Sequence, residues 1–307
     1  MSRRRKGNPV SGWVIVDKPE GPTSTQIVGI VRRLLNAQKA GHAGTLDPLA
    51  NGILAIALGE ATKTIPFIMD AEKTYRFTVR WGVATTTDDA EGETCQTSDV
   101  RPQKAEIEAA LATFVGDISQ VPPIFSAIKV NGERAYDLAR AGEDVVLKAR
   151  TVHIFEAKLV NVLDVDHAEI EIHCSKGTYV RSLARDLALK LGTCGHVSEL
   201  RRTAIGPFVE SLSIPLDKLK DLGHSAPARL TSVDILRPIE TALDDIPALA
   251  LTGNDASRLQ RGQSVLLRGR DAPILSGTVL ATHRGNPVAL TEYVGGELKP
   301  VRVFNLP

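Results

Sequence analysis

Hydrophobic and polar residues follow two different spacings along the first two-thirds of the chain. From Thr74 to Trp81 they alternate, as in a half-buried strand. After Thr23 and Ser24, which can cap a helix, apolar residues recur at helical spacing to Leu35. The same criteria predict helices over residues 106–114 and 179–191, and strands over 13–16, 53–58, 125–130, 151–163 and 168–174. Because helices and strands do not alternate regularly, the pattern predicts an α+β fold.

The pattern changes in the last third of the chain. Residues 216–243 are predicted to be helical or irregular, with Pro227 and Pro238 as interruptions. Beyond them, short β-like runs are separated by glycines, at residues 264–267, 277–282, 287–293 and 301–304. This spacing is typical of a small β-barrel. We therefore expect two domains, residues 1–245 and residues 246–307.

Composition narrows the class of protein. The chain has 307 residues and is 43% hydrophobic, enough for the core of one large and one smaller domain. No apolar run has the length of a membrane span, and no signal-peptide apolar region follows the basic N-terminus. Cys95, Cys174 and Cys194 lie far apart, which is typical of a reducing compartment without disulfides or a zinc site. We expect a cytoplasmic protein without a metal ion.

The formal net charge is only +1, but the charges are unevenly spread. Acidic residues gather in residues 88–93 and at Asp244 and Asp245. The basic residues that recur near the candidate motifs are residues 3–6, Arg32, Arg33, Lys39, Lys176, Arg181, Arg185, Arg201 and Arg202. Each basic pair alone is typical of a solvated face. Their grouping predicts a local phosphate-binding strip, whose affinity for nucleic acid would fall steeply with salt.

The most informative segment is residues 41–52, which read GHAGTLDPLANG. Its glycines permit backbone angles and close approaches that other residues do not, and Pro48 biases Asp47 toward an extended conformation. Asp47 has no cysteine, serine or second carboxylate beside it. That pattern favours a carboxylate that acts alone as a nucleophile. The Asp-Pro pair by itself is also typical of a turn or a helix cap.

Three segments, in order, resemble the bacterial TruB-type tRNA pseudouridine synthases. They are residues 41–52, residues 12–24 with the sequence GWVIVDKPEGPTS, and residues 175–183 with the sequence SKGTYVRSL. The resemblance covers about the first two-thirds of the chain. It implies a large mixed, mainly antiparallel sheet with flanking helices and an active cleft across its middle. It also implies a C-terminal PUA-like domain that grips the acceptor-stem side of the RNA; a purely structural role for this domain is the alternative.

The resemblance implies an enzyme that converts a uridine in the TΨC loop of tRNA, conventionally position 55, to pseudouridine. In this reaction uracil leaves its sugar, rotates and rejoins through carbon 5. No redox change occurs and no water is consumed, so we expect no cofactor. The target nucleotide must leave its stack, because its reacting atoms are inaccessible within the RNA arm. The sequence does not distinguish three routes for the carboxylate: attack at C1′ of the ribose, abstraction of a sugar proton on a glycal route, and addition to C6 of the base.

The resemblance also implies three catalytic residues. Asp47 corresponds to the nucleophile. Tyr75 corresponds to a tyrosine that stacks on the target base and helps to remove the C5 proton; without the resemblance it would be an ordinary half-buried strand tyrosine. Arg181 corresponds to an arginine that pairs with the carboxylate and keeps it charged and aimed, a task suited to its planar fork. The alternative for Arg181 is a helix-surface cation near Asp186.

Five further residues are implied as substrate contacts or supports. His42 corresponds to a histidine beside the flipped-out nucleotide, with a structural hydrogen bond as its alternative. Tyr179 corresponds to a contact of the flipped uridine. Leu200 corresponds to an apolar residue of the base pocket, although leucine alone would be assigned to the core. Lys18 and Pro19 are expected to brace the catalytic loop.

The expected partner is the TΨC arm of tRNA, bound by a monomer without a membrane and without a guide RNA. A guide-RNA-dependent synthase of the archaeal and eukaryotic type shares the motifs, but the long terminal extensions of the eukaryotic form are missing from this sequence. A tRNA chaperone, whose chemistry is secondary, is the alternative from another class. Asp47 distinguishes them, since a binder would not need it.

Overall fold

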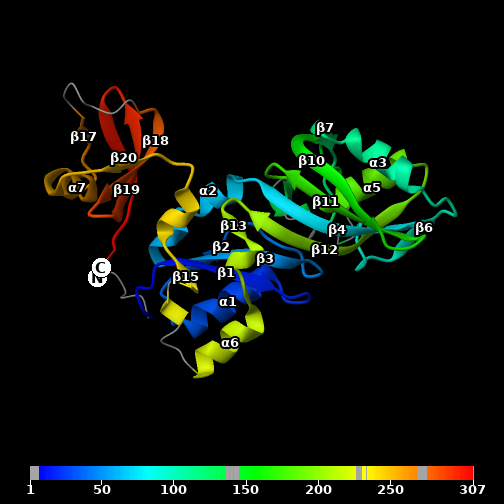
Figure 1. The fold of residues 1–307 in the computed structure, drawn as a ribbon, viewed down its shortest axis with the longest axis horizontal. Coiled ribbons are helices and arrows are strands. Elements are labelled where there is room, and N and C mark those ends of the chain that lie inside the picture. The colour runs from blue at the N-terminus through cyan, green and yellow to red at the C-terminus, as the bar shows by residue number, and fades with distance from the viewer. Residues whose placement is uncertain are drawn as a thin grey trace.

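The computed structural model describes residues 7–126, 128–130, 132–135, 138, 141, 145–225, 230–232, 234–267 and 275–306. Two features discussed above, the basic residues 3–6 and the interruption at Pro227, lie outside these residues. The described part contains one large sheet with helices packed against it and a smaller sheet near the C-terminus (Figure 1). None of the helices in this part has the length and apolar character that a membrane span requires.

The large sheet has eleven strands in the described part, in the order β14-β1-β3-β12-β4-β11-β10-β7, with β2, β13 and β15 attached beside this path. Their bounds are β1 Gly12–Lys18, β2 Ala40–His42, β3 Asn51–Leu58, β4 Lys73–Trp81, β7 Gly116–Gln120, β10 Arg150–Val162, β11 His167–Cys174, β12 Gly195–Ile205, β13 Phe208–Val209, β14 Ile214–Pro215 and β15 Leu236–Arg237. Only the pairs β12–β3 and β1–β14 are parallel. The predicted mixed, mainly antiparallel sheet is therefore confirmed.

Helices cover the sheet at both ends (Figure 1). Their bounds are α1 Ser24–Leu34, α2 Ile65–Asp70, α3 Lys104–Ala112, α5 Val180–Lys190, α6 Leu216–Ser225 and α7 Gly253–Gln260, with short 3₁₀ turns η1 Gly59–Lys63, η2 Glu210–Leu212 and η4 Ile239–Leu243. Two small hairpins are formed by β5 Val83–Thr85 with β6 Thr94–Thr97, and by β8 Lys129–Val130 with β9 Glu133–Arg134. As predicted, Thr23 caps α1, where its side chain and that of Gln26 form a capping box.

The C-terminal strands form a separate five-stranded sheet, in the order β16-β18-β19-β20-β17. Their bounds are β16 Ala248–Ala250, β17 Val265–Leu266, β18 Gly277–His283, β19 Asn286–Val294 and β20 Glu297–Val303. The sheet curls into a half-barrel of the PUA-like type (Figure 1). Helix α7 was not predicted. Thr252 caps it, and Ala256 and Leu259 bury its apolar side against this sheet.

Further elements also differ from the prediction. Residues 125–130 were expected to form one strand, but only Lys129–Val130 pairs as β8, and residues 124–126 form a bend. The carbonyl of Phe125 in this bend accepts a hydrogen bond from Arg181, a tertiary contact that overrides the local β preference. Helix α2 and the long strand β12 were also missed.

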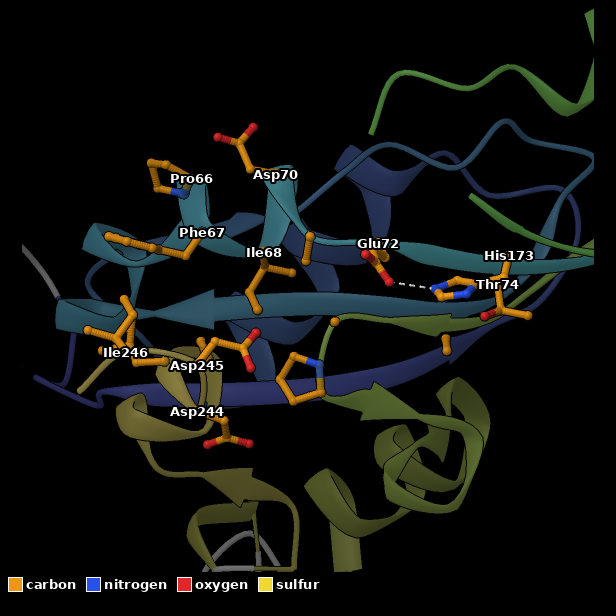
Figure 2. Close-up of a pocket in the computed structure, with 16 residues that line it drawn as sticks. Pro66, Phe67, Ile68, Asp70, Glu72, Thr74, His173, Asp244, Asp245 and Ile246 are labelled. Carbon is orange, nitrogen blue, oxygen red and sulfur yellow. Dashed lines mark ion pairs between the residues drawn. The ribbon is translucent and has the colours of Figure 1, made fainter. Parts of the chain in front are cut away.

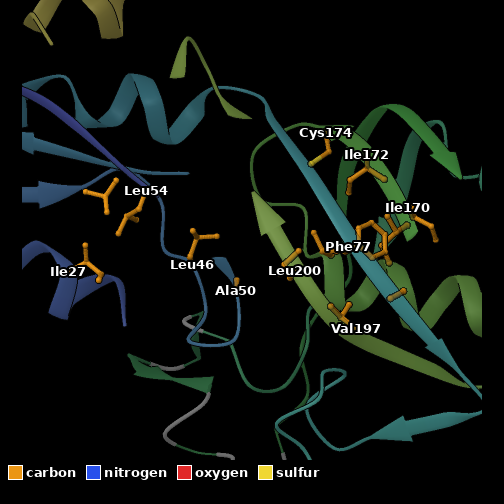
Figure 3. Close-up of a cluster of buried hydrophobic side chains, with 14 of the residues drawn as sticks. Ile27, Leu46, Ala50, Leu54, Phe77, Ile170, Ile172, Cys174, Val197 and Leu200 are labelled. Carbon is orange, nitrogen blue, oxygen red and sulfur yellow. The ribbon is translucent and has the colours of Figure 1, made fainter. Parts of the chain in front are cut away.

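Two buried clusters hold the sheet in place. One extends from Ile27 of α1 to Ile170 of β11, and in Figure 3 Leu46 and Leu200 lie between these ends. The other occupies the opposite face of β1 and β3. It joins Trp13 to residues of the C-terminal sheet, Leu280, Leu290 and Phe304.

Candidate active site

The loop that carries Asp47 lies between β2 and β3 and is held on both sides of that residue. The buried Lys18 ammonium donates to the carbonyls of Pro48 and Ala50 at 3.1 and 2.5 Å. On the other side, the Ser24 hydroxyl donates to the Leu46 carbonyl at 3.0 Å, and the Leu46 N–H donates back at 2.9 Å. The backbone on either side of Asp47 is therefore fixed without help from the Asp47 carboxylate.

Arg202 fixes the two ends of the same loop. Its side chain is buried and donates to the carbonyls of Gly44 and Ile53 at 3.1 and 2.8 Å. Gly52 has φ +97°, and a Cβ there would lie 2.3 Å from the Arg202 carbonyl oxygen, so only glycine fits. The prediction that Arg202 belongs to a phosphate-binding strip is wrong, because its guanidinium lies inside the protein.

Arg181 joins two carboxylates at the start of α5. Its Nη2 lies 2.9 Å from Oδ2 of Asp47, and its Nη1 lies 3.1 Å from Oδ2 of Asp89. The two nitrogens also donate to the carbonyls of Phe125 and Thr87, both at 3.0 Å. The Arg181 side chain is only 6% exposed, whereas that of Asp47 is 38% exposed. The alternative of a surface cation is therefore wrong, and one side of the Asp47 carboxylate stays open.

The acidic residues 88–93 were expected to lie away from the motifs, but two of them contact arginines of α5. Asp89 is buried and accepts hydrogen bonds from the Thr87 hydroxyl at 2.5 Å and the Glu91 N–H at 3.0 Å. Asp88 forms an ion pair with Arg185 at 2.8 Å. Carboxylates therefore neutralise Arg181 and Arg185, which were both assigned to the phosphate-binding strip. A polar run directly after a strand was the signal that could have located Asp89.

Arg201, the remaining arginine of the β12 pair, is also engaged. Its Nη2 lies 3.0 Å from Oδ2 of Asp17, and its Nε lies 2.6 Å from Oε1 of Glu210. The side chain of Asn51 accepts a further hydrogen bond from Nη1 at 2.9 Å. These contacts leave little free charge near the loop, which agrees with the nearly neutral composition.

A cavity of about 330 Å³ opens beside Asp47. Five of the expected catalytic and substrate-binding residues line it, although they come from different elements: Asp47, Tyr75, Tyr179, Arg181 and Leu200. The buried Arg202 also contributes to its wall. Lys73, Ser126 and Thr178 line it as well, and none of these was singled out. A carboxyl group, an arginine and two tyrosines around a cavity of this size can surround a single flipped nucleotide.

Local contacts orient the two tyrosines. Tyr75 lies on β4 opposite Arg202 of β12. Burial raises the pKa of Tyr75 above its usual range, with Arg202 acting in the opposite direction. Tyr179 precedes α5, where its N–H and carbonyl exchange hydrogen bonds of 2.8 and 3.1 Å with the side chain of Gln120. The guanidinium of Arg150 stacks over the Tyr179 ring at 4.6 Å.

Three residues singled out from the sequence do not line this cavity. Lys18 and Pro19 line a separate hollow of about 310 Å³ behind the loop. His42 lies on β2, and burial lowers its pKa. Its Nδ1 is buried without a hydrogen-bond partner in the part of the chain that the structure describes. The alternative of a structural hydrogen bond is therefore not found at Nδ1.

A second cavity, of about 970 Å³, lies elsewhere (Figure 2). Thr74 lines it, whereas the next residue, Tyr75, lines the smaller cavity, so the two open on opposite faces of β4. The acidic residues on its walls are Asp70, Glu72, Asp244 and Asp245. Glu72 and Asp70 are paired with His173 and Lys176, and the two remaining acids repel a phosphate backbone, which favours the smaller cavity as the RNA site.

Lys18 predicts a pH dependence of stability. Burial lowers the pKa of Lys18 from 10.5 to about 8, and Asp47 acts in the opposite direction. Between about pH 8 and 10.5 the unfolded chain therefore binds more protons at this residue than the folded chain. The free energy of unfolding should rise with pH in this window, by at most about 1.4 kcal/mol per pH unit.

Urea unfolding of Lys18→Met across this pH window should show a weaker rise than the wild type. The control is Lys104→Met, because the Lys104 side chain on α3 is 71% exposed and should leave the slope unchanged. Equal slopes for the wild type and Lys18→Met would contradict the role of Lys18 in this dependence.

Comparison with known proteins agrees with this geometry. A model of the TruB family pseudouridylate synthase N-terminal domain matches residues 32–180, and a model of the tRNA pseudouridylate synthase B C-terminal domain matches residues 181–244. A protein named tRNA pseudouridine synthase B from Caulobacter vibrioides is 56% identical over 313 residues and covers all of both chains. Its counterpart from Bradyrhizobium diazoefficiens is 58% identical, covering 99% of this chain and 88% of its own.

A solved structure described as a Cbf5-Nop10-Gar1 complex superimposes with a TM-score of 0.75 at 26% identity. The match covers 96% of this chain and 85% of the solved chain. The shared sheet and the pocket around Asp47 define a pseudouridine synthase. More narrowly, the chain belongs to the TruB family of pseudouridylate synthases, as its two family models and its full-length relatives show.

Proposed function

We propose that this enzyme isomerises a uridine in the TΨC loop of tRNA, conventionally position 55, to pseudouridine, with Asp47 as the nucleophile. One observation carries the proposal: the partly open Asp47 carboxylate faces a nucleotide-sized cavity while Arg181 holds it from the protein side. The names of the relatives support tRNA as the substrate.

The surrounding residues fit the steps of this reaction. The glycosidic C1′–N1 bond breaks, the C1′–C5 bond forms, the proton on C5 leaves and N1 regains a proton. Asp47 supplies the carboxylate, and Arg181 fixes its orientation. Tyr75 stacks on the base, and because its raised pKa keeps the phenol neutral at ordinary pH, it assists removal of the C5 proton through hydrogen bonding rather than as a phenolate base.

The remaining residues bind or support the substrate. Tyr179 and Leu200 line the cavity and contact the flipped uridine. His42 lies on the strand that leads into the catalytic loop; because it does not line the cavity, its contact would be with the part of the flipped nucleotide that lies outside the cavity. Lys18 and Pro19 brace the loop from behind, since the Lys18 ammonium also donates to the Pro19 carbonyl at 3.0 Å.

The division of the chain is also a proposal. Residues 1–245 form the catalytic domain, and residues 246–307 form a PUA-like domain that contacts the acceptor-stem side of the tRNA. A separate buried cluster within the C-terminal sheet supports the boundary.

The RNA contact of the C-terminal domain needs a test that leaves the fold intact. Because Phe304 packs in one cluster with Trp13, truncation would uncover the core. Charge reversal of Arg258 and Arg261 is the cleaner test, and an unchanged Kd for tRNA would remove the role.

We further propose a cytoplasmic monomer that needs no guide RNA. The Caulobacter vibrioides relative, whose whole length this chain matches, carries a name that refers to tRNA. A requirement for an added protein or guide RNA before any activity appears would contradict this proposal. A mass measured in solution that corresponds to two chains would contradict the monomer.

Tritium release tests the function. Unmodified tRNA labelled at C5 of uridine should release one equivalent of tritium with the wild-type enzyme, in the presence of chelator and without cofactor. The modified position should map to the TΨC loop. The same tRNA with cytidine at the target position is the control and should release nothing from that site. Tight binding without tritium release would contradict the proposal.

A further inference from the structure

One buried polar group at the active cavity has no role in the chemistry described above. Ser126 lines the cavity with Asp47 and Tyr75, and its side chain is 4% exposed. Its hydroxyl oxygen is buried and has no hydrogen-bond partner among the described residues. Buried hydroxyls are normally paired, because leaving one unpaired costs free energy. An unpaired hydroxyl on a cavity wall is therefore a candidate ligand contact.

The position of Ser126 is tied to the catalytic carboxylate. Its N–H donates to the Ile124 carbonyl at 2.9 Å, which closes the bend at residues 124–126. The neighbouring Phe125 carbonyl accepts from Nη2 of Arg181 at 3.0 Å, and the same nitrogen lies 2.9 Å from Asp47. One guanidinium group, that of Arg181, thus contacts both the Asp47 carboxylate and the bend that carries Ser126.

Three other side-chain donors around the cavity, besides the tyrosines and arginines described above, are already engaged or exposed. The Thr178 hydroxyl donates to the Ser175 carbonyl at 3.0 Å. The Lys73 ammonium donates to the carbonyls of Met69 and Ala71. Thr45 is exposed. Among these side chains, Ser126 alone combines burial with a free hydroxyl.

The reaction gives such a donor a specific task. Uracil has an approximate two-fold axis through N3 and C6, and rotation about this axis exchanges N1 with C5. The same rotation exchanges the two carbonyl oxygens, O2 and O4. A hydroxyl that donates to one carbonyl before the rotation therefore meets the other carbonyl afterwards. We propose that Ser126 donates a hydrogen bond to a uracil carbonyl oxygen in both orientations and so retains the detached base in register.

This inference rests on the proposed function, and its test separates the two. Single-turnover rates are measured for stem-loop RNAs with uridine, 2-thiouridine or 4-thiouridine at the target position, with the pseudouridine product identified by nucleoside chromatography. Ser126→Ala should slow the uridine substrate about tenfold, the loss expected for one hydrogen bond. Sulfur is a weak acceptor, so Ser126→Ala should slow each thio substrate by much less than tenfold. Each comparison is made between two enzymes on one substrate, so intrinsic thio effects cancel.

Two variants exclude a purely structural effect. Ser126→Thr keeps the hydroxyl and should recover most of the rate on uridine. Ser198→Ala is the control. The Ser198 hydroxyl donates to the Thr78 carbonyl at a distance of 3.3 Å, and Ser198 does not line the cavity. Any loss of rate with this variant should therefore be equal on all three substrates. An equal loss on all three substrates with Ser126→Ala would overturn the inference. If the rate loss caused by Ser126→Ala became smaller with only one of the two thio substrates, Ser126 would contact the base in only one orientation, which would overturn contact in both. A wild-type enzyme inactive on uridine would overturn the proposed function instead.

Discussion

Replacing Asp47 by asparagine should abolish pseudouridine formation and leave tRNA binding nearly intact. The amide has almost the same shape but cannot act as a nucleophile. The loop backbone is held by Lys18 and Ser24 rather than by the Asp47 side chain, so the fold should not change. Arg181 keeps its second ion pair, to Asp89, so its buried charge stays neutralised. We expect the single-turnover rate to fall roughly 10⁴-fold or more, as when one member of a catalytic unit is removed.

The measurement compares single-turnover rates with the Kd for tRNA. Asp17→Asn is a matched control, because Asp17 is also a partly exposed carboxylate paired with an arginine but lies outside the cavity. It should change the rate only a few-fold. If Asp47→Asn loses tRNA binding together with activity, Asp47 is structural and the mechanism is wrong. Lost activity with intact binding also separates the enzyme from a tRNA chaperone.

Arg181→Met should lower both activity and stability, for different reasons. Asp47 loses the group that orients it, and we expect the rate to fall about 10²- to 10³-fold, as when one preorganised charge is removed from an active site. Asp89, whose side chain is 3% exposed, is left without its ion-pair partner. Removal of one partner from a buried ion pair costs about 3–5 kcal/mol of unfolding free energy.

A double variant separates the two effects. Arg181→Met combined with Asp89→Leu removes both buried charges, and replacing a whole buried pair is often neutral for stability. Urea unfolding should show recovered stability, while the single-turnover rate stays low. If activity returned with stability, Arg181 would act only by neutralising Asp89. Arg185→Met, one turn further along α5, removes the contact with Asp88 outside the cavity and should slow the reaction far less.

Much of the fold and part of the site could be predicted because their signals are local. Alternation over 74–81 and 168–174 reports which side chains face the core, and the structure pairs these segments as β4 and β11. The helical spacing after Thr23 is equally local, as is its capping box. Strand β12 was missed because it contains Ser198, Glu199, Arg201 and Arg202, and its burial depends on a neighbouring strand rather than on alternation.

Ion pairing could not be predicted in the same way. The sequence shows twelve arginines and lysines near the motifs but not which acid each one meets. Asp47, Asp89 and Arg181 are separated by 42 to 134 positions in the chain. Only folding brings the two carboxylates to 2.9 and 3.1 Å from the Arg181 guanidinium. The assignment of the α5 and β12 arginines to the phosphate-binding strip failed for this reason, since these four side chains are neutralised or buried.

The sequence by itself determined the secondary structure of most of the sheet, the loop that carries Asp47 and membership of a family. These follow from short-range periodicity and from ordered motifs. The tertiary structure alone decided that Asp89 shares Arg181 with Asp47 and that residues 124–126 bend instead of pairing. It also decided that Ser126 lines the cavity without a hydrogen-bond partner among the residues that the structure describes. Electrostatic and hydrogen-bond partners are chosen by distance in space, and distance in space is not encoded in local spacing.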